Sequence, residues 1–188
     1  MNPFQPSHNA LGMVEWNSVA QGVFAADAML KVSQVELLYA NTICPGKYIC
    51  LVRGDTAAVR ASVEAGKDAS PTALVDELVI PNLHPSVFPA LSASASVLGR
   101  DAIGVIETFS AASAVIAADK AAKTAEITLL SLRLATGLGG KSYVILTGEV
   151  AAVQSAVNAG ASAAKDKGLL VQTAVIPDPE PRLFDKLN

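Results

Sequence analysis

The sequence predicts an α/β sandwich made by tandem duplication of one unit of about 90 residues. The first observation behind this prediction is an internal repeat: residues 10–15, Ala-Leu-Gly-Met-Val-Glu, return as Ala-Ile-Gly-Val-Ile-Glu at residues 102–107. The second is the order of hydrophobic patterns in each copy, which runs strand, helix, strand, turn, strand, helix, strand. That order is typical of a sandwich of ferredoxin-like character, with helices packed on an open sheet.

The repeat continues along the chain and sets the domain limits. Gly54 to Val59 matches Gly148 to Val153, and Val-Ile-Pro at residues 79–81 returns at residues 175–177. A Ser/Ala/Gly-rich stretch at residues 93–99 is suited to a linker. We therefore expect an N-terminal arm over residues 1–9, a first domain over residues 10–97 and a second domain over residues 98–188.

Within the first copy, each element has its own signal. Residues 10–15, 35–39 and 48–52 are apolar runs typical of strands. Asp55 is a candidate N-cap for a helix over residues 56–65, with Gly66 as its C-cap. A helix is also expected from Ser18 to Lys31, with one apolar side made by Val19, Val23, Ala26, Met29 and Leu30.

Composition and charge exclude several classes of protein. With 51% hydrophobic and 16% charged residues the chain is globular, and a formal charge of −3 gives no reason to expect nucleic acid or anionic lipid as a partner. Charged residues interrupt every apolar window well before the roughly 20 residues of a membrane helix. The first residues do not resemble a signal peptide, and two cysteines make no disulfide framework, so we expect a reducing cytosol.

The turn at residues 42–47, Thr-Ile-Cys-Pro-Gly-Lys, is the candidate functional site. Pro45 fixes its backbone angle and Gly46 tolerates positive φ, so the two hold Cys44 at a bend where its sulfur can face outward. One thiol is a poor metal site, because structural centres need about three or four ligands. A metal at Cys44 would therefore have to be shared between symmetry-related chains.

The second copy has a different turn at the same place. Residues 136–141 read Thr-Gly-Leu-Gly-Gly-Lys, without cysteine. The spacing does not match a phosphate-binding loop, since only Gly137 and Gly140 precede Lys141 at relevant positions. We interpret the turn as a pore rim, formed by Gly137, Leu138, Gly139 and Gly140, where glycines let backbones approach an axis.

The other chemically active residues have structural interpretations. Cys50 lies inside the strand that follows the turn and is expected in the core. His84 stands on a proline-constrained loop and His8 in the arm, and neither is assigned a function. Glu15 and Glu107 end equivalent strands, and their repetition indicates a shared structural hydrogen bond and not an acid–base pair.

Together these motifs resemble the bacterial microcompartment shell domain, present twice as in the tandem-domain shell proteins. They comprise the strand opening, the Ala-Ala-Asp helix, the glycine turn before Lys47 and Lys141, the second helix start and the Val-Ile-Pro ending. The Cys44 turn and residues 80–87 are similar to those of shell proteins of the propanediol-utilisation type. The resemblance covers about residues 10–188.

The resemblance implies a homotrimer shaped as a pseudohexameric tile in the shell of a microcompartment in the cytoplasm. It also implies one [4Fe-4S] cluster per trimer, held at the three-fold axis by Cys44 of each chain, for electron transfer or cluster exchange across the shell. Ile43, Pro45, Gly46 and Lys47 would line the axial turn, and Lys47 would offset the cluster's charge. Lys31 and Lys123 match the family's edge lysines and would contact neighbouring tiles. Other shell proteins and an encapsulated redox enzyme are the expected partners.

Two alternatives stay open at this stage. In one, the trimer's axis is a plain metabolite pore and Cys44 remains a free thiol. In the other, the protein is an enzyme with Cys44 as a nucleophile, which requires a neighbouring base. The histidines are too few, and no catalytic arrangement of residues is visible, so the sequence favours a protein that is not an enzyme.

Overall fold

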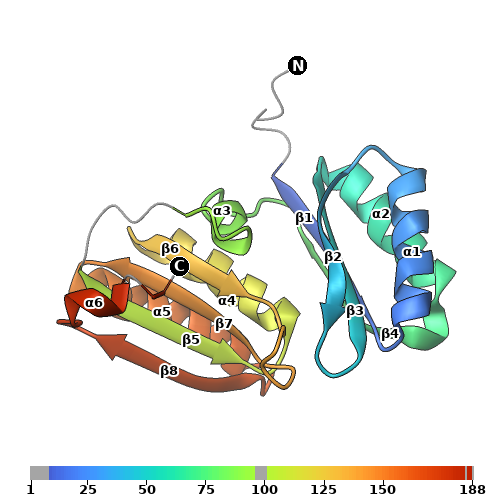
Figure 1. The fold of residues 1–188 in the computed structure, drawn as a ribbon. Helices are drawn as coiled ribbons and strands as arrows, with labels where there is room; N and C mark the ends of the chain where they lie inside the picture. The colour runs from blue at the N-terminus through green and yellow to red at the C-terminus, as the bar shows by residue number, and fades with distance from the viewer. Residues whose placement is uncertain (1–8, 96–100, 185, 188) are drawn as a thin grey trace. The chain divides into compact units, whose positions relative to one another are not determined.

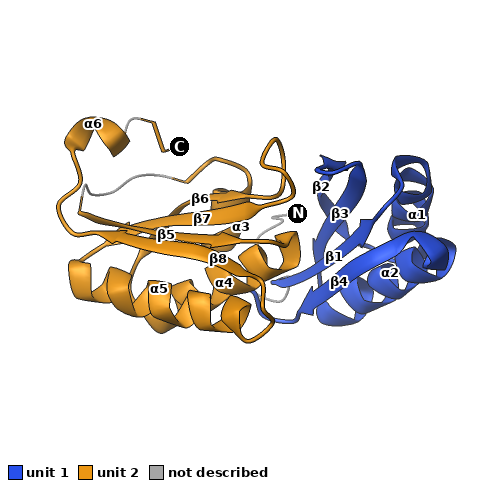
Figure 2. Cartoon of the chain, turned by 90° about the horizontal axis from the view of Figure 1, so that it is seen from below, with its two compact units in different colours: residues 1–83 blue, residues 84–188 orange. Residues whose placement is uncertain are grey.

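The computed structural model describes residues 9–95, 101–184, 186 and 187. The chain divides into two compact units, residues 1–83 and 84–188 (Figure 2). Residues 84–95, which the sequence assigns to the first domain, therefore pack with the second unit. Most of the expected arm and of the expected linker lies outside the described residues, so the domain limits at 97 and 98 stay a prediction.

The first unit follows the predicted order of elements. Its sheet has the strand order β2-β3-β1-β4 with antiparallel neighbours, which is the ferredoxin-like arrangement (Figure 1). The elements are β1 (Ala10–Trp16), α1 (Val19–Val32), β2 (Glu36–Ile43), β3 (Lys47–Gly54), α2 (Thr56–Ala69), a 3-10 turn (Pro71–Ala73) and β4 (Leu74–Ile80).

The second unit repeats this topology after one short additional helix. Its sheet order, β6-β7-β5-β8, is the same order with the equivalent strands. The elements are α3 (Val87–Leu91), β5 (Ala102–Thr108), α4 (Ala111–Thr124), β6 (Thr128–Arg133), β7 (Ser142–Gly148), α5 (Val150–Lys165), β8 (Leu170–Ile176) and α6 (Pro181–Phe184). The predicted duplication and fold class are confirmed.

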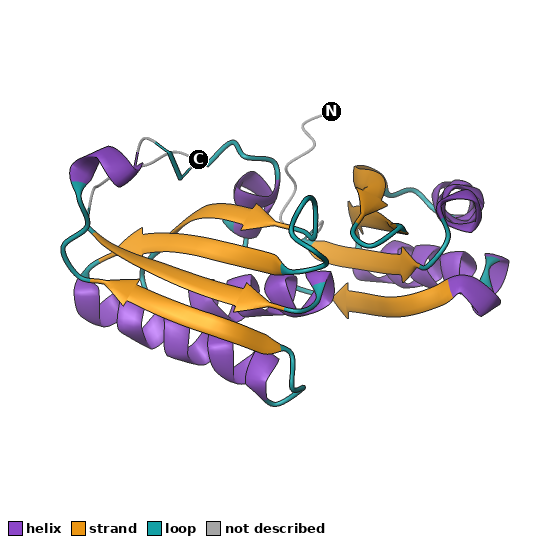
Figure 3. Cartoon of the chain, turned by 60° about the horizontal axis from the view of Figure 1, so that its bottom comes forward, coloured by secondary structure: helices purple, strands orange, loops and turns teal. Residues whose placement is uncertain are grey.

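In each unit the two long helices cover one face of the sheet. In the first unit Val14 and Trp16 of β1 pack there with Met29 of α1 and Val63 of α2. In the second unit α6 lies on the other side of the sheet from α5 (Figure 3), where Phe184 packs with Ile103 of β5. No helix among the described residues is both long enough and apolar enough to cross a membrane.

The apolar side predicted for α1 is partly wrong. Val19, Val23 and Leu30 are exposed, and the buried residues are Gly22, Ala25, Ala26 and Met29. The helix packs through its small residues because the sheet approaches closely: a Cβ atom on Gly22 would lie 2.5 Å from Cβ of Tyr48. An apolar stripe is thereby left on the surface of α1.

The helix α2 starts as predicted but does not end as predicted. Asp55 is its N-cap, with Oδ1 accepting from the amides of Ala57 and Ala58 at 2.9 Å. Gly66 is not a C-cap, because the helix continues to Ala69. Its role is close packing, since a Cβ atom there would lie 2.6 Å from Cγ of Met29. Gly160 of α5 has the same role in the second unit, 2.6 Å from Cδ1 of Ile106.

Candidate functional site

Cys44 lies in the tight loop that joins β2 to β3. Ile43, the last residue of β2, pairs with Lys47, the first of β3, so the loop contains only Cys44, Pro45 and Gly46. Ile43 is buried, Cys44 is partly exposed, and Pro45 and Gly46 are exposed. The predicted placement of a thiol on an exposed turn is confirmed.

Backbone conformation explains the residue types of this loop. The Cys44–Pro45 peptide bond is cis, and Gly46 has a φ of +66°. Apart from its chain neighbours, no described residue has an atom within 4 Å of a Cβ built on Gly46, so glycine is needed there for its backbone angle and not for space. The loop is therefore a tight hairpin turn in which Cys44 is partly exposed.

An ion pair closes the base of each hairpin. Lys47 is bound to Glu15 in the first unit, and Lys141 is bound to Glu107 in the second. The repeated carboxylates are thus structural, as predicted. The first pair is the more enclosed, because the side chain of Glu15 is 3% exposed and that of Glu107 is 31% exposed. Because Glu15 carries the opposite charge, the pair of Lys47 and Glu15 has no net charge.

The equivalent loop of the second unit is longer and more open. It runs from residue 134 to residue 141 and has positive φ at Ala135, Gly137, Gly139 and Gly140. In the part of the chain that the structure describes, no residue other than the chain neighbours lies within 4 Å of Cβ atoms built on Gly137 and Gly139. The loop is fixed at its start, where the Ala135 amide donates to Oγ of Ser142 at 3.1 Å, and the glycines extend beyond that point.

The second cysteine is buried in the core, as predicted. Cys50 lies on β3 opposite Val14 and packs in the core cluster of the first unit. Burial raises the pKa of its thiol to about 12, because the thiolate would lose its hydration. Because Cys50 is fully buried in the core and Cys44 is partly exposed, Cys44 is the cysteine available to bind a metal.

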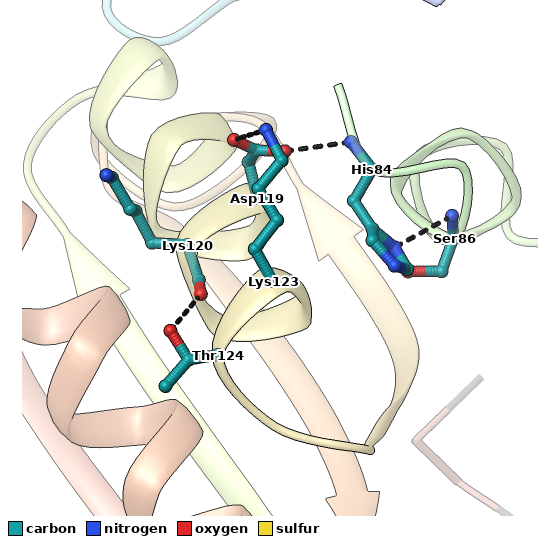
Figure 4. A network of polar contacts seen from close by, with 6 residues as sticks. All are labelled: His84, Ser86, Asp119, Lys120, Lys123 and Thr124. Atoms are coloured by element: carbon teal, nitrogen blue, oxygen red, sulfur yellow. Dashed lines mark hydrogen bonds and ion pairs between the residues drawn. The ribbon is translucent and has the colours of Figure 1, made fainter. Parts of the chain in front are cut away.

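The two candidate edge lysines have equivalent local partners. Lys31 pairs with Asp27 on α1, and Lys123 pairs with Asp119 on α4 at 2.7 Å. Asp119 has a further role that the sequence did not reveal, since its Oδ1 accepts from the backbone amide of His84 at 2.8 Å (Figure 4). No local sequence motif predicts this contact, because the two residues lie 35 positions apart.

The comparisons with known proteins agree with this architecture. The family model of the BMC domain matches residues 10–83 and again residues 102–179. The chain therefore belongs to the BMC-domain family of bacterial microcompartment shell proteins and carries the domain twice. Its family is one of structural shell proteins, and its place is the shell of a microcompartment.

Individual relatives indicate which type of shell protein the chain is similar to. The chain is 43% identical to the microcompartment shell protein PduT of Citrobacter freundii, over 95% of this chain and 97% of that protein. It is 36% identical to the carboxysome assembly protein CcmO of a Synechocystis species, over 100% of this chain and 66% of that protein. The predicted resemblance to the propanediol-utilisation type is confirmed.

Solved structures also match. A microcompartment protein from Desulfitobacterium hafniense DCB superposes with a TM-score of 0.90 and 50% identity, covering 94% of this chain and 98% of that one. A fused permuted hexameric shell protein from the RMM microcompartment has a TM-score of 0.58 at 22% identity, which shows a shared fold alone.

Proposed function

We propose that three copies of this chain form a pseudohexameric shell tile, and that Cys44 of each copy holds one [4Fe-4S] cluster at the three-fold axis. Two equivalent domains per chain supply six domains from three chains, which matches a closed symmetric ring. The observation that carries the cluster is the partly exposed thiol on a tight hairpin, at the place where the second copy has a glycine loop.

The donor set fits a shared cluster better than a site within one chain. Iron–sulfur clusters are held by thiolates, and three Cys44 side chains would provide three of the usual four. Among the described residues, one chain contains no group of three or more Asp, Glu, His or Cys side chains that could hold a metal ion. Under this proposal the fourth ligand comes from water, an exogenous molecule or a backbone group.

The chain's own residues would position the thiol. Pro45 and Gly46 set the turn, and buried Ile43 anchors its base. The pair between Lys47 and Glu15 ties the same base to β1. A bound [4Fe-4S] cluster supplies one-electron transfer, so the proposed role is electron transfer or cluster exchange across the shell.

The proposal extends to partners. Lys31 and Lys123 are the proposed contacts with neighbouring tiles, each held in place by an aspartate one helical turn earlier. Other shell proteins would surround the tile, and an encapsulated redox enzyme would exchange electrons with the cluster.

Anaerobic purification tests the cluster. We expect brown protein with an absorption band near 400 nm and about four irons per three chains. The Cys44→Ser protein should be colourless but should form an oligomer of unchanged size. The Cys50→Ala protein should keep the colour, because Cys50 lies in the core. Colourless wild-type protein after reconstitution with iron and sulfide would refute the cluster while leaving the tile intact.

A second candidate function is an axial metabolite pore without a cluster. The open glycine loop at residues 137–140 favours it, because Gly137 and Gly139 have free space around them. Under this alternative Cys44 stays a free thiol in every preparation. Iron and sulfide content, measured as above, separates the two functions.

A further inference from the structure

Each copy of the repeat ends in a similar tail. His84-Pro-Ser-Val-Phe88 matches Glu180-Pro-Arg-Leu-Phe184, with the spacing of 96 residues that also relates Val79 to Val175. Both tails form a short helix, α3 and α6. The first tail packs on α4 and β6 of the second unit. The second tail instead lies on its own sheet through Phe184.

A buried carboxylate receives the first tail. Asp119 of α4 accepts the His84 amide with one oxygen, at 2.8 Å, and binds Lys123 with the other, at 2.7 Å. The His84 ring is held by the Ser86 hydroxyl, 2.8 Å from its Nδ1, at the start of the tail helix (Figure 4). Asp119 of α4 thus binds the first residue of the tail that packs on this helix.

The helix α1 has an equivalent aspartate and an equivalent valine, but no tail covers them in the described residues of the chain. Asp27 and Val23 of α1 correspond to Asp119 and Val115 of α4. Val115 is 0% exposed, whereas Val23 is 51% exposed. Asp27 is also exposed and binds Lys31 with Oδ2, while the described residues provide no donor for its Oδ1.

The second tail also has an exposed residue at the position that is buried in the first tail. Val87 of the first tail is 1% exposed, and its equivalent Leu183 is 38% exposed. Glu180, the equivalent of His84, is exposed too. The first tail packs on α4 inside the second unit, and both Val87 and Val115 are buried there. Their equivalents, Leu183 of the second tail and Val23 of α1, are exposed.

We propose that α1 of one chain binds the tail of a second copy of the same chain. The amide of the partner's Glu180 would donate to Oδ1 of Asp27, and the partner's Leu183 would cover Val23. Phe184 keeps its place on its own sheet, so no segment has to refold. The contact joins the tail of one chain to α1 of another, so it is head-to-tail, and in the proposed trimer three such contacts complete the ring. The inference rests on the proposed trimer and names the contact that forms it.

Cysteine cross-linking tests the contact. In a Cys44→Ser background, we would combine Asp27→Cys with Glu180→Cys and oxidise the protein mildly. The expected result on a non-reducing gel is bands of two and three linked chains, with no longer ladder. The matched control combines His84→Cys with Asp119→Cys, which should link only within one chain. Buried Cys50 takes no part in either reaction.

Light scattering on the Cys44→Ser parent protein measures its oligomeric state and so separates failure of this contact from failure of the proposed trimer. A trimeric parent whose double variant forms no interchain disulfide, or only an intrachain one, overturns this inference and leaves the proposed trimer standing. A monomeric parent overturns both.

A second variant tests the apolar part of the contact. Val23→Asp should convert trimers into monomers with an unchanged circular dichroism spectrum. Val32→Asp is the control, since Val32 is equally exposed but lies on the opposite side of the same helix. Trimers that persist in Val23→Asp would contradict the inference.

Discussion

Replacing Lys47 by methionine should destabilise the first unit far more than the equivalent change in the second. Methionine keeps most of the apolar stem and removes only the charge. The side chain of Glu15 is 3% exposed, so its carboxylate would be left buried without a partner. Loss of one partner from a buried pair costs about 3 to 5 kcal/mol, and the partial exposure of Lys47 lowers our expectation to about 2 to 4 kcal/mol.

Lys141→Met is the matched control. Glu107 is 31% exposed and can be hydrated after the lysine is lost, so the expected cost is below about 1 kcal/mol. The double variant Glu15→Gln with Lys47→Met should recover much of the lost stability, because it removes the unpaired charge. Urea unfolding followed by circular dichroism measures all of these at one protein concentration, since assembly contributes to stability. Equal losses in Lys47→Met and Lys141→Met would refute the reasoning.

Two further predictions concern the cores. Gly160→Ala should lower the free energy of unfolding by about 1 to 2 kcal/mol, because its Cβ would lie 2.7 Å from the backbone oxygen of Ala117. Gly66→Ala should cost less, since it meets the flexible Met29 side chain, and a larger loss for Gly66→Ala in urea unfolding would count against this packing argument. Burial raises the pKa of the Cys50 thiol to about 12. The buried neutral thiol therefore contributes its whole stabilisation below the ordinary thiol pKa of about 9, and this stabilisation is lost as pH rises from about 9 to about 12. Wild-type protein should therefore lose more stability than Cys50→Ala over that range, and parallel pH profiles would show that the thiol is not buried in solution.

The fold could be predicted from the sequence because the same signals occur twice. A single strand or helix pattern is ambiguous, but two copies in the same order exclude most alternatives. Asp55 was recognisable as an N-cap, because that signal is local. The thiol on its turn and the structural role of Glu15 were predictable for a similar reason, since a proline–glycine turn and a repeated carboxylate are visible in the sequence itself.

The errors arose where packing overrides local pattern. Gly66 was predicted as a helix end because glycine often ends helices, but it is retained inside α2 to let Met29 approach. Helical spacing predicts one apolar side for α1, but it does not show that the small residues of the helix are the ones that face the sheet. The contact between His84 and Asp119 depends on which unit the tail packs against, which no local signal determines.

Subunit mixing tests the central claim most directly, because a cluster shared by three chains needs all three thiols. Wild-type and Cys44→Ser chains would be coexpressed at known ratios, and iron and sulfide counted per trimer after anaerobic reconstitution. At equal amounts, cluster content should fall to roughly one eighth of the wild-type value, since about that fraction of random trimers has three Cys44 residues. A linear fall to about one half would mean that each chain binds iron by itself and would contradict the shared site.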